Sequence, residues 1–349
     1  MLKPYLLLLL LAFLPAAAAV AAPSPVTVTQ TTWHGWTQAV KLSNGIVEAV
    51  IVPQIGRVMA FEFAGQPNTN PLYENPDWTV AKNRVAKPGE WANYGGDKVW
   101  PAPQSDWPRL IGHDFPPDPA FDGLPEAVTL LPSGLRLSSP ASAAFGLRIE
   151  RTFTLRPGLP RLYLSQTLVR TRPSAAPDRP LAVWAITQVG GDGLFVLPLP
   201  ALSAARTSPF PLGYQSLSSP PVTPPFWRVT VVRGRRVLLG QRDPDTSHKV
   251  ATKARAGWLA RVSDTGIVFA ERTAIQQNGL YPDSDSPSEI YSNAGNSNYL
   301  ELEMLGPLRP VRPGHPLTTQ ITWQLTRLPS VPSDLIEAAN QAVRAAASL

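Results

Sequence analysis

Proline and glycine are spread along almost the whole chain, and this restricts it to short secondary-structure elements. The sequence contains 40 Pro and 24 Gly. Proline lacks the backbone N–H that an inner helical turn needs, and both residues interrupt regular elements, so long helices are excluded nearly everywhere. Between them lie short runs that alternate polar and apolar residues or are rich in β-branched residues, which is typical of strands. The expected strands are 46–52, 57–63, 147–155, 161–169, 181–189, 228–232, 257–262, 267–270, 299–304 and 318–326.

This many strands, without helical periods between them, predicts an all-β protein built as a sandwich of large antiparallel sheets. The strand patterns look alike throughout, so residues 22–329 are expected to form one domain. The last segment, 330–349, is the exception and predicts a short C-terminal helix near 333–346, with Ser333 as its cap. Its apolar stripe at helical spacing consists of Leu335, Ile336, Ala339 and Val343.

Residues 1–21 have the pattern of a signal peptide. Lys3 precedes a short apolar run at 6–14, and small residues at 16–22 offer an A-x-A cleavage pattern at 19–21. No other long apolar run follows, so we expect an exported, periplasmic or secreted protein without stable membrane insertion. The chain has no Cys, which excludes a disulfide framework, a thiol nucleophile and lipid attachment at a cysteine.

Charge and motifs narrow the possible functions further. The chain carries a formal net charge of +6, with its main basic cluster at 228–242, where Arg alternates with Val and Leu. This pattern predicts a solvated hairpin rather than a nucleic-acid site, which export also disfavours. Gly-rich phosphate loops, the nucleophile-elbow motif and the HExxH metal motif are absent, and no cofactor or metal site is expected. Asp283 and Asp285 lack the Gly and Glu of a calcium loop and predict an acidic surface turn.

The segment from 91 to 107, WANYGGDKVWPAPQSDW, combines three Trp with amide and charged groups. It looks too polar and too broken for a core strand, so we expect a loop. Rigid aromatic rings beside such groups can stack on a sugar ring and bind its hydroxyls, or the indoles can simply cover a sheet. Both interpretations stay open. The possible sugar ligands in the segment are Tyr94, Lys98, Trp100 and Gln104.

In the strand at 299–304, the two-residue period places Tyr299, Glu301 and Glu303 on one face. Leu300, Leu302 and Met304 occupy the other face and are expected to belong to the core. The polar face is either a solvated exterior or the wall of a polar cleft, and the sequence leaves this choice open.

Five motifs together are similar to those of a known group. They are LSNGIVEAVIVPQIGRV at 42–58, YGGDKVWPAPQ at 94–104, LAVWAITQV at 181–189, KARAGWLARV at 253–262 and YLELEMLGP at 299–307. The chain resembles an uncharacterised family of exported bacterial proteins within the galactose mutarotase-like, or aldose 1-epimerase-like, superfamily, over roughly 33–325. The resemblance implies a β-supersandwich whose concave sheet binds carbohydrate.

Mutarotases use a Glu base and a His acid, and the resemblance assigns the base to Glu303. The corresponding strand carries no His: Trp184 and Gln188 are present instead, and Gln188 can bind a hydroxyl but cannot exchange a proton. The best-placed substitute acid is His113, and Lys98 is a further one.

We therefore expect a carbohydrate-binding protein whose catalytic ability is open, with Tyr94, Lys98, Trp100, Gln104, Trp184, Gln188 and Glu301 as ligands. The alternative is a sugar-processing enzyme, either an epimerase or a glycan lyase or hydrolase, with Glu303 as its base. A structural protein with a vestigial cleft is a third possibility. The sequence leaves open the sugar and the oligomeric state.

Overall fold

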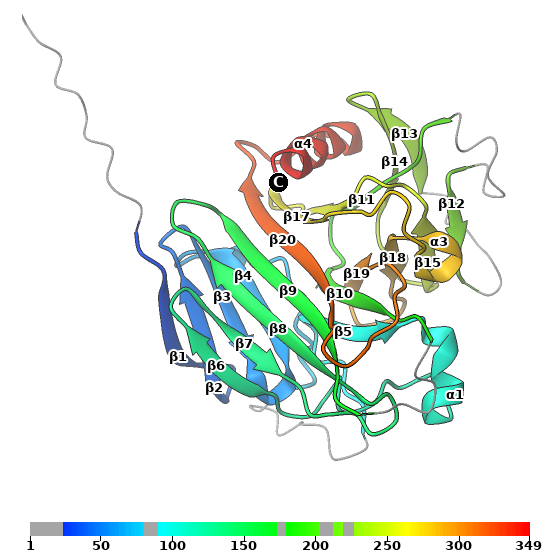
Figure 1. Cartoon of the computed structure of the whole chain (residues 1–349). Coiled ribbons are helices and arrows are strands. Elements are labelled where there is room, and N and C mark those ends of the chain that lie inside the picture. Colours follow the sequence, from blue (N-terminus) through cyan, green and yellow to red (C-terminus); the bar gives the residue numbers. More distant parts are fainter. Residues whose placement is uncertain (1–23, 80–89, 173–178, 203–211, 219–226) are drawn as a thin grey trace, which may run out of the picture.

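The computed structural model describes residues 24–79, 90–172, 179–202, 212–218 and 227–349. The expected signal peptide lies outside these ranges. The described chain forms two ten-stranded antiparallel sheets that pack face to face (Figure 1), which confirms the predicted all-β sandwich. Among the described residues, no helix is long and apolar enough to cross a membrane.

The first sheet contains, in spatial order, β1 (Thr27–Trp33), β2 (Trp36–Ser43), β3 (Val47–Val52), β4 (Arg57–Phe63), β5 (Asp97–Ala102), β10 (Ala182–Gly190), β19 (Tyr299–Leu305), β18 (Ser288–Ser292), β15 (His248–Thr252) and β12 (Tyr214–Ser216). The second contains β13 (Arg228–Val232), β14 (Arg235–Gly240), β11 (Leu194–Pro198), β16 (Trp258–Val262), β17 (Ile267–Thr273), β20 (Leu317–Arg327), β9 (Arg161–Arg170), β8 (Leu147–Leu155), β7 (Gly134–Ser138) and β6 (Ala127–Leu131). All ten predicted strands lie on observed strands, and the β13–β14 hairpin turns at Arg233 and Gly234 as expected.

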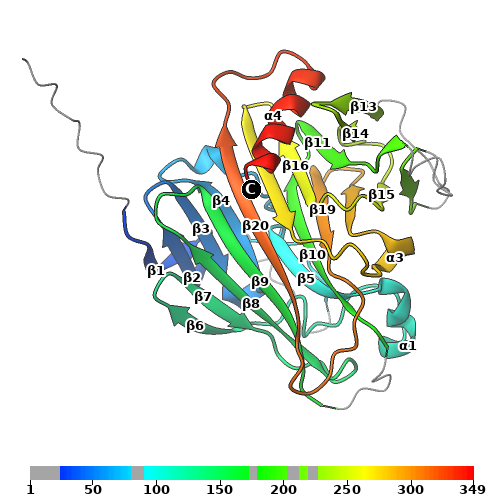
Figure 2. The ribbon, with the colours of Figure 1, turned by 45° about the horizontal axis from the view of Figure 1, so that its top comes forward.

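The helices of the described residues are few and short. They are α1 (Trp107–Ile111), α3 (Pro282–Asp285), α4 (Leu335–Ala347) and the 3₁₀ turns η1 (Pro53–Ile55), η2 (Pro67–Thr69) and η4 (Gln104–Asp106). Helix α4 covers β11, β16 and β17 on the outer face of the second sheet (Figure 2). The predicted helix is thus present, but its cap is Asp334, not Ser333. The Asp334 side chain accepts from the N–H groups of Ile336 and Glu337, both at 2.8 Å.

The expectation that the segment 91–107 is a loop was wrong at its centre. Residues Asp97–Ala102 form β5, which pairs with β10 in the middle of the first sheet and has all six side chains buried. Its charged residues made it look like a loop, yet both charges are paired. Asp97 faces the second sheet and bonds Arg151, while Lys98 faces the opposite side and bonds Glu301.

The Arg151–Asp97 ion pair joins the two sheets through the core. Arg151 lies on β8, and its guanidinium bonds Asp97, the Gln166 side chain at 3.0 Å and the Gly56 carbonyl at 2.7 Å. Both charged side chains are almost fully buried. Since a buried charge requires a partner, this pair holds β5 at a fixed height against the second sheet.

We expect Arg151→Ala to lower the free energy of unfolding by about 3–5 kcal/mol, because it leaves the buried Asp97 carboxylate without a cation. Urea denaturation measures this change. The matched control is Arg148→Ala on the same strand, which breaks the partly exposed pair with Glu150 and should cost below about 1 kcal/mol. Equal losses in the two variants would contradict the structural role of the pair.

Candidate functional site

The outer face of the first sheet, turned away from the second sheet, carries a row of charged and aromatic side chains. Strands β5, β10, β19, β18 and β15 are neighbours there. Glu301 on β19 lies opposite Gln188 and Tyr291, and Glu303 lies opposite Ile186 and Glu289. The alternate residues of β19 pack in the core between the sheets, as the two-residue period predicted.

A cavity of about 350 Å³ lies on this face. Its floor comes from the strands, and its walls come from the segments before and after β5. The residues that line it are Trp91, Lys98, Trp100, Gln104, Phe115, Trp184, Lys249, Tyr291, Tyr299, Glu301 and Glu303. We call this space the first cavity.

Aromatic rings form much of its wall, and buried polar groups hold them. Trp100 meets Trp184 edge to face at 5.4 Å between ring centroids. The indole N–H groups of Trp91 and Trp100 both donate to Asp122 Oδ2, at 3.2 and 3.1 Å. Asp122 in turn pairs with the buried Arg57. The indoles are therefore fixed in orientation before any ligand arrives.

Lys98 and Glu301 form an ion pair at the floor. The Nζ of Lys98 lies 3.2 Å from Glu301 Oε1 and 4.6 Å from the centroid of the Trp100 ring. Gln188 Nε2 donates to the same Glu301 oxygen at 2.8 Å. Gln188 is fully buried and does not line the first cavity, so it orients Glu301 instead of reaching a ligand.

A second group of charges surrounds Glu303. Its Oε2 accepts from Trp184 Nε1 at 2.6 Å and from Lys249 Nζ at 2.8 Å. The same ammonium lies 2.9 Å from Glu289 Oε2. Among the described residues, Glu303 Oε1 has no hydrogen-bond partner although it is buried. One cation thus serves two buried carboxyl groups.

This arrangement favours a proton on one of the two carboxyl groups. Burial raises the pKa of Glu303 and raises that of Glu289 well above its usual value, while Lys249 opposes both shifts. Burial alone would lower the pKa of Lys249, but the two carboxyl groups outweigh it and raise that pKa. A protonated and an ionised carboxyl group side by side can act as an acid and a base.

The structure brings most of the predicted site residues together. Lys98, Trp100, Gln104, Trp184, Glu301 and Glu303 all line the first cavity. Gln188 lies just beneath it. Their roles toward a ligand stay predictions.

Two predicted residues lie elsewhere. Tyr94 is buried in a separate cluster, edge on to Trp36 and Trp78. Gly95 and Gly96, both at positive φ, turn the chain between it and β5. His113 is exposed beyond the end of α1 and does not line the first cavity. The structure therefore offers neither as a contact in this cavity.

Sequence reasoning missed Lys249, Glu289 and Tyr291. They lie on the five-residue strands β15 and β18. The sequence signal for these strands was the alternation of these residues with small or apolar ones. Lys and Glu are depleted in strands, and in segments this short they outweigh the alternation, so neither strand was recognised.

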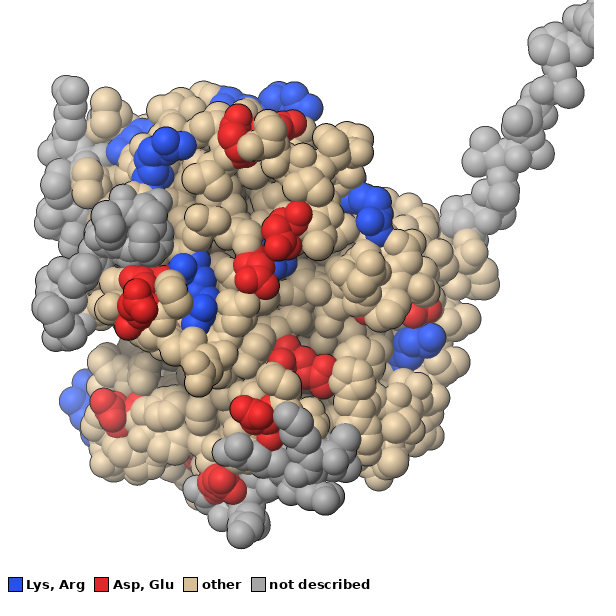
Figure 3. Space-filling model, turned by 180° about the vertical axis from the view of Figure 1, so that it is seen from behind, with Lys and Arg blue, Asp and Glu red and all other residues tan. Residues whose placement is uncertain are grey.

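Charge elsewhere on the molecule is dispersed. In the β13–β14 hairpin, Arg228 and Arg235 are exposed, while Arg236 donates to the Pro200 carbonyl at 2.8 Å. Among the described residues visible in Figure 3, acidic and basic side chains are interspersed and form no continuous basic field. This agrees with the expected solvated hairpin.

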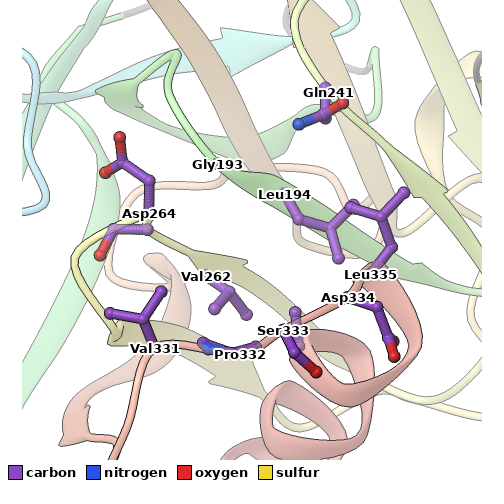
Figure 4. Close-up of a pocket in the computed structure, with 12 residues that line it drawn as sticks. Gly193, Leu194, Gln241, Val262, Asp264, Val331, Pro332, Ser333, Asp334 and Leu335 are labelled. Carbon is purple, nitrogen blue, oxygen red and sulfur yellow. The ribbon is translucent and has the colours of Figure 1, made fainter.

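A separate cavity of about 300 Å³ lies beside the start of α4. Figure 4 shows Leu194, Val262 and Leu335 around its centre. Two of its polar residues have structural partners: Asp334 caps α4, and Ser333 donates to Glu337 at 3.0 Å. We assign this cavity to the packing of the helix.

The chain belongs to the family described as "Domain of unknown function (DUF4380)", whose model matches residues 37–326. No curated protein matches it in sequence.

Similar solved structures include a candidate mutarotase from Salmonella typhimurium, with 11% identity, a TM-score of 0.53, and coverage of 89% of this chain and 98% of that one. A candidate aldose 1-epimerase from Klebsiella pneumoniae has 10% identity, a TM-score of 0.51, and coverage of 92% and 87%. Another from Escherichia coli K12 has 11% identity, a TM-score of 0.50, and coverage of 87% and 100%. These likenesses show the fold, which is galactose mutarotase-like, as the resemblance found in the sequence implied.

We expect Glu289→Gln to flatten the pH dependence of stability. The raised pKa means that the folded chain holds this proton more tightly than the unfolded chain. Its contribution is therefore present below the usual pKa of 4.5 and is lost as the pH rises through the folded-state pKa. Gln carries no such proton, so the free energy of unfolding, measured in urea at a series of pH values, should fall less steeply in the variant.

The control for this experiment is Glu150→Gln on the second sheet, which should follow the wild-type curve. A Glu289→Gln curve parallel to that of the wild type would contradict the raised pKa of Glu289 in the folded chain.

Proposed function

We propose that this member of the DUF4380 family binds carbohydrate in the first cavity. The observation that carries the proposal is the meeting, in one cavity, of three indoles with the Lys98–Glu301 pair and with Glu303. Indole faces stack on the C–H faces of sugar rings, and charged groups bind hydroxyls strongly. The cavity volume of about 350 Å³ also suits a small ligand.

Preorganisation supports the same proposal. The indoles of Trp91 and Trp100 are tethered to Asp122, and Glu301 is held by both Lys98 and Gln188. A ligand would therefore meet side chains that have already lost much of their rotational freedom, which reduces the entropic cost of binding. The solved structures of similar fold are described as candidate mutarotases or aldose 1-epimerases, and aldoses are sugars.

A second function, proton transfer on the bound sugar, is favoured by the carboxyl groups that share Lys249. In ring opening, Glu303 would take the proton of the anomeric hydroxyl while an acid gives one to the ring oxygen, and the bond between the anomeric carbon and that oxygen breaks. Lys249 is the cation that pairs with Glu303. Its raised pKa makes it a weak acid, so we place catalysis after binding.

Phe115 provides a clean test of binding. It lines the first cavity, packs edge on to Trp91 at 5.0 Å, and is 46% exposed. We expect Phe115→Ala to weaken saccharide binding about tenfold through the loss of an aromatic contact, as measured by calorimetry. Little stability should be lost, because nearly half of the side chain is already exposed to water.

Leu130→Ala is the matched control, since Leu130 is 62% exposed on the second sheet. It should leave binding unchanged. If the wild-type protein binds no member of a broad saccharide panel more tightly than millimolar, the proposed function is wrong.

Glu303→Gln tests the second function. We expect it to reduce the rate of mutarotation by about 10²–10⁴-fold, the usual contribution of a general base, while saccharide binding persists. Polarimetry on a panel of aldoses measures the rate, with Glu150→Gln as the control. An unchanged rate in Glu303→Gln, or no activity in the wild type, would remove the catalytic assignment and leave the binding proposal intact.

A further inference from the structure

A second cavity adjoins the first. It has a volume of about 340 Å³, and Gln104, Trp184 and Lys249 line both spaces. Its remaining lining residues are Ser105, Asp114, Leu217 and Asp283. Each cavity alone is at the lower end of the range for small-molecule sites, and the two together reach the middle of that range.

We propose that this second cavity is a sugar subsite for the neighbouring residue of an oligosaccharide, and that Asp283 makes it prefer a residue with a protonated amine over one with a carboxylate. The inference rests on the proposed carbohydrate binding in the first cavity. It extends that function to a ligand of at least two linked sugars, with the Trp184 indole at the junction.

Asp283 is held in place by an unusual turn. Asp283, Ser284 and Asp285 follow one another at φ values of 48°, 60° and 72°, a left-handed backbone that L-residues adopt at a cost. Arg255 Nη2 bonds Asp285 Oδ2 at 2.7 Å, and the N–H of Tyr281 donates to Asp285 Oδ1 at 3.1 Å. The sequence predicts only an acidic surface turn here, but Asp283 is partly buried and lines the second cavity.

Gln215 secures the same turn from β12. Its Nε2 donates to the Asp283 carbonyl and, at 3.2 Å, to Ser286 Oγ. Contacts from several parts of the chain thus fix the backbone of the strained turn, from which Asp283 lines the second cavity.

Charge pairing distinguishes the two cavities. Lys98 is paired with Glu301, and Lys249 with Glu289 and Glu303. Within the described part of the chain, no ion pair includes Asp114 or Asp283, so the second cavity has negative charge without a cationic partner of its own. The chain as a whole carries +6, which makes this acidity local.

An unsatisfied buried atom belongs to Glu303, which lines the first cavity beside two residues that both cavities share. Glu303 borders the shared residues Trp184 and Lys249, is fully buried, and leaves Oε1 without a hydrogen-bond partner among the described residues. A buried acceptor of this kind is costly unless a ligand donates to it. A hydroxyl or ammonium donor of a bound sugar would satisfy it, whereas a uronate carboxylate would be repelled.

The experiment uses calorimetry on the full chain with a saccharide panel of gluco, galacto and manno series. Each is supplied as the monosaccharide and as linked dimers, in neutral, amino and uronate forms. We expect the best dimer to bind at least about tenfold more tightly than its monosaccharide, and amino dimers to bind about fivefold to tenfold more tightly than uronate dimers. Equal affinity of dimers and monosaccharides, or a preference for uronates, would overturn the inference alone. No binding at all would overturn the proposed function itself.

The Asp283→Asn variant tests whether the preference for amino dimers comes from the Asp283 carboxylate. Asn tolerates the left-handed backbone, so the turn should persist, which an unchanged thermal unfolding midpoint would verify. We expect about fivefold to tenfold weaker binding of amino dimers, with unchanged affinity for monosaccharides. Glu150→Gln, which removes one carboxylate from the second sheet, should change neither. Equal losses for monosaccharides and dimers would overturn the assignment of Asp283 to a second subsite.

Discussion

Buried charge needs a partner, and β5 meets this requirement on both of its faces. Consecutive residues of a strand point in opposite directions, so Asp97 enters the core to meet Arg151 while Lys98 enters the first cavity to meet Glu301. The ion pair that ties the two sheets together therefore also sets the height of the cavity floor. Trp100 lies two residues beyond Lys98 and therefore points to the same face of the sheet. A hydrogen bond to Asp122 also holds its indole.

Stability and the proposed ligand binding make opposing demands on this floor. Each buried carboxyl group is expensive, and in the described part of the chain one ammonium serves both Glu289 and Glu303, so well-packed apolar residues in their place would be neutral or stabilising. The unpartnered oxygen of Glu303 adds to that cost. Buried polar groups without partners tend to occur at functional sites, where a ligand can complete their hydrogen bonding.

The sequence predicted the long strands well because their signal is local. Strands such as β8, β9 and β20 alternate along most of their length and need no distant information. β5, β15 and β18 contain charged residues, which are typical of loops. Their place in buried strands becomes understandable only once their ion-pair partners are known. Lys98 and Glu301 are 203 positions apart, so nothing near Lys98 in the sequence announces its pairing. The resemblance to mutarotases supplied the fold and Glu303, while Lys249, Glu289 and the turn at Asp283 required coordinates.

The side chains of β10 bear on the choice between the two proposed functions, binding and catalysis. The resemblance implies an acidic His on this central strand, but here the strand supplies neutral donors to the two carboxyl groups: Trp184 holds Glu303, and the buried Gln188 holds Glu301. Groups able to exchange a proton with a sugar come instead from the neighbouring strands. Release of a proton from Lys249 would leave Glu289 and Glu303 buried without their cation, and the raised pKa of Lys249 expresses that cost. The same pairing makes release of that proton difficult and keeps the floor rigid, which supports the proposed binding function more than the proposed catalytic one.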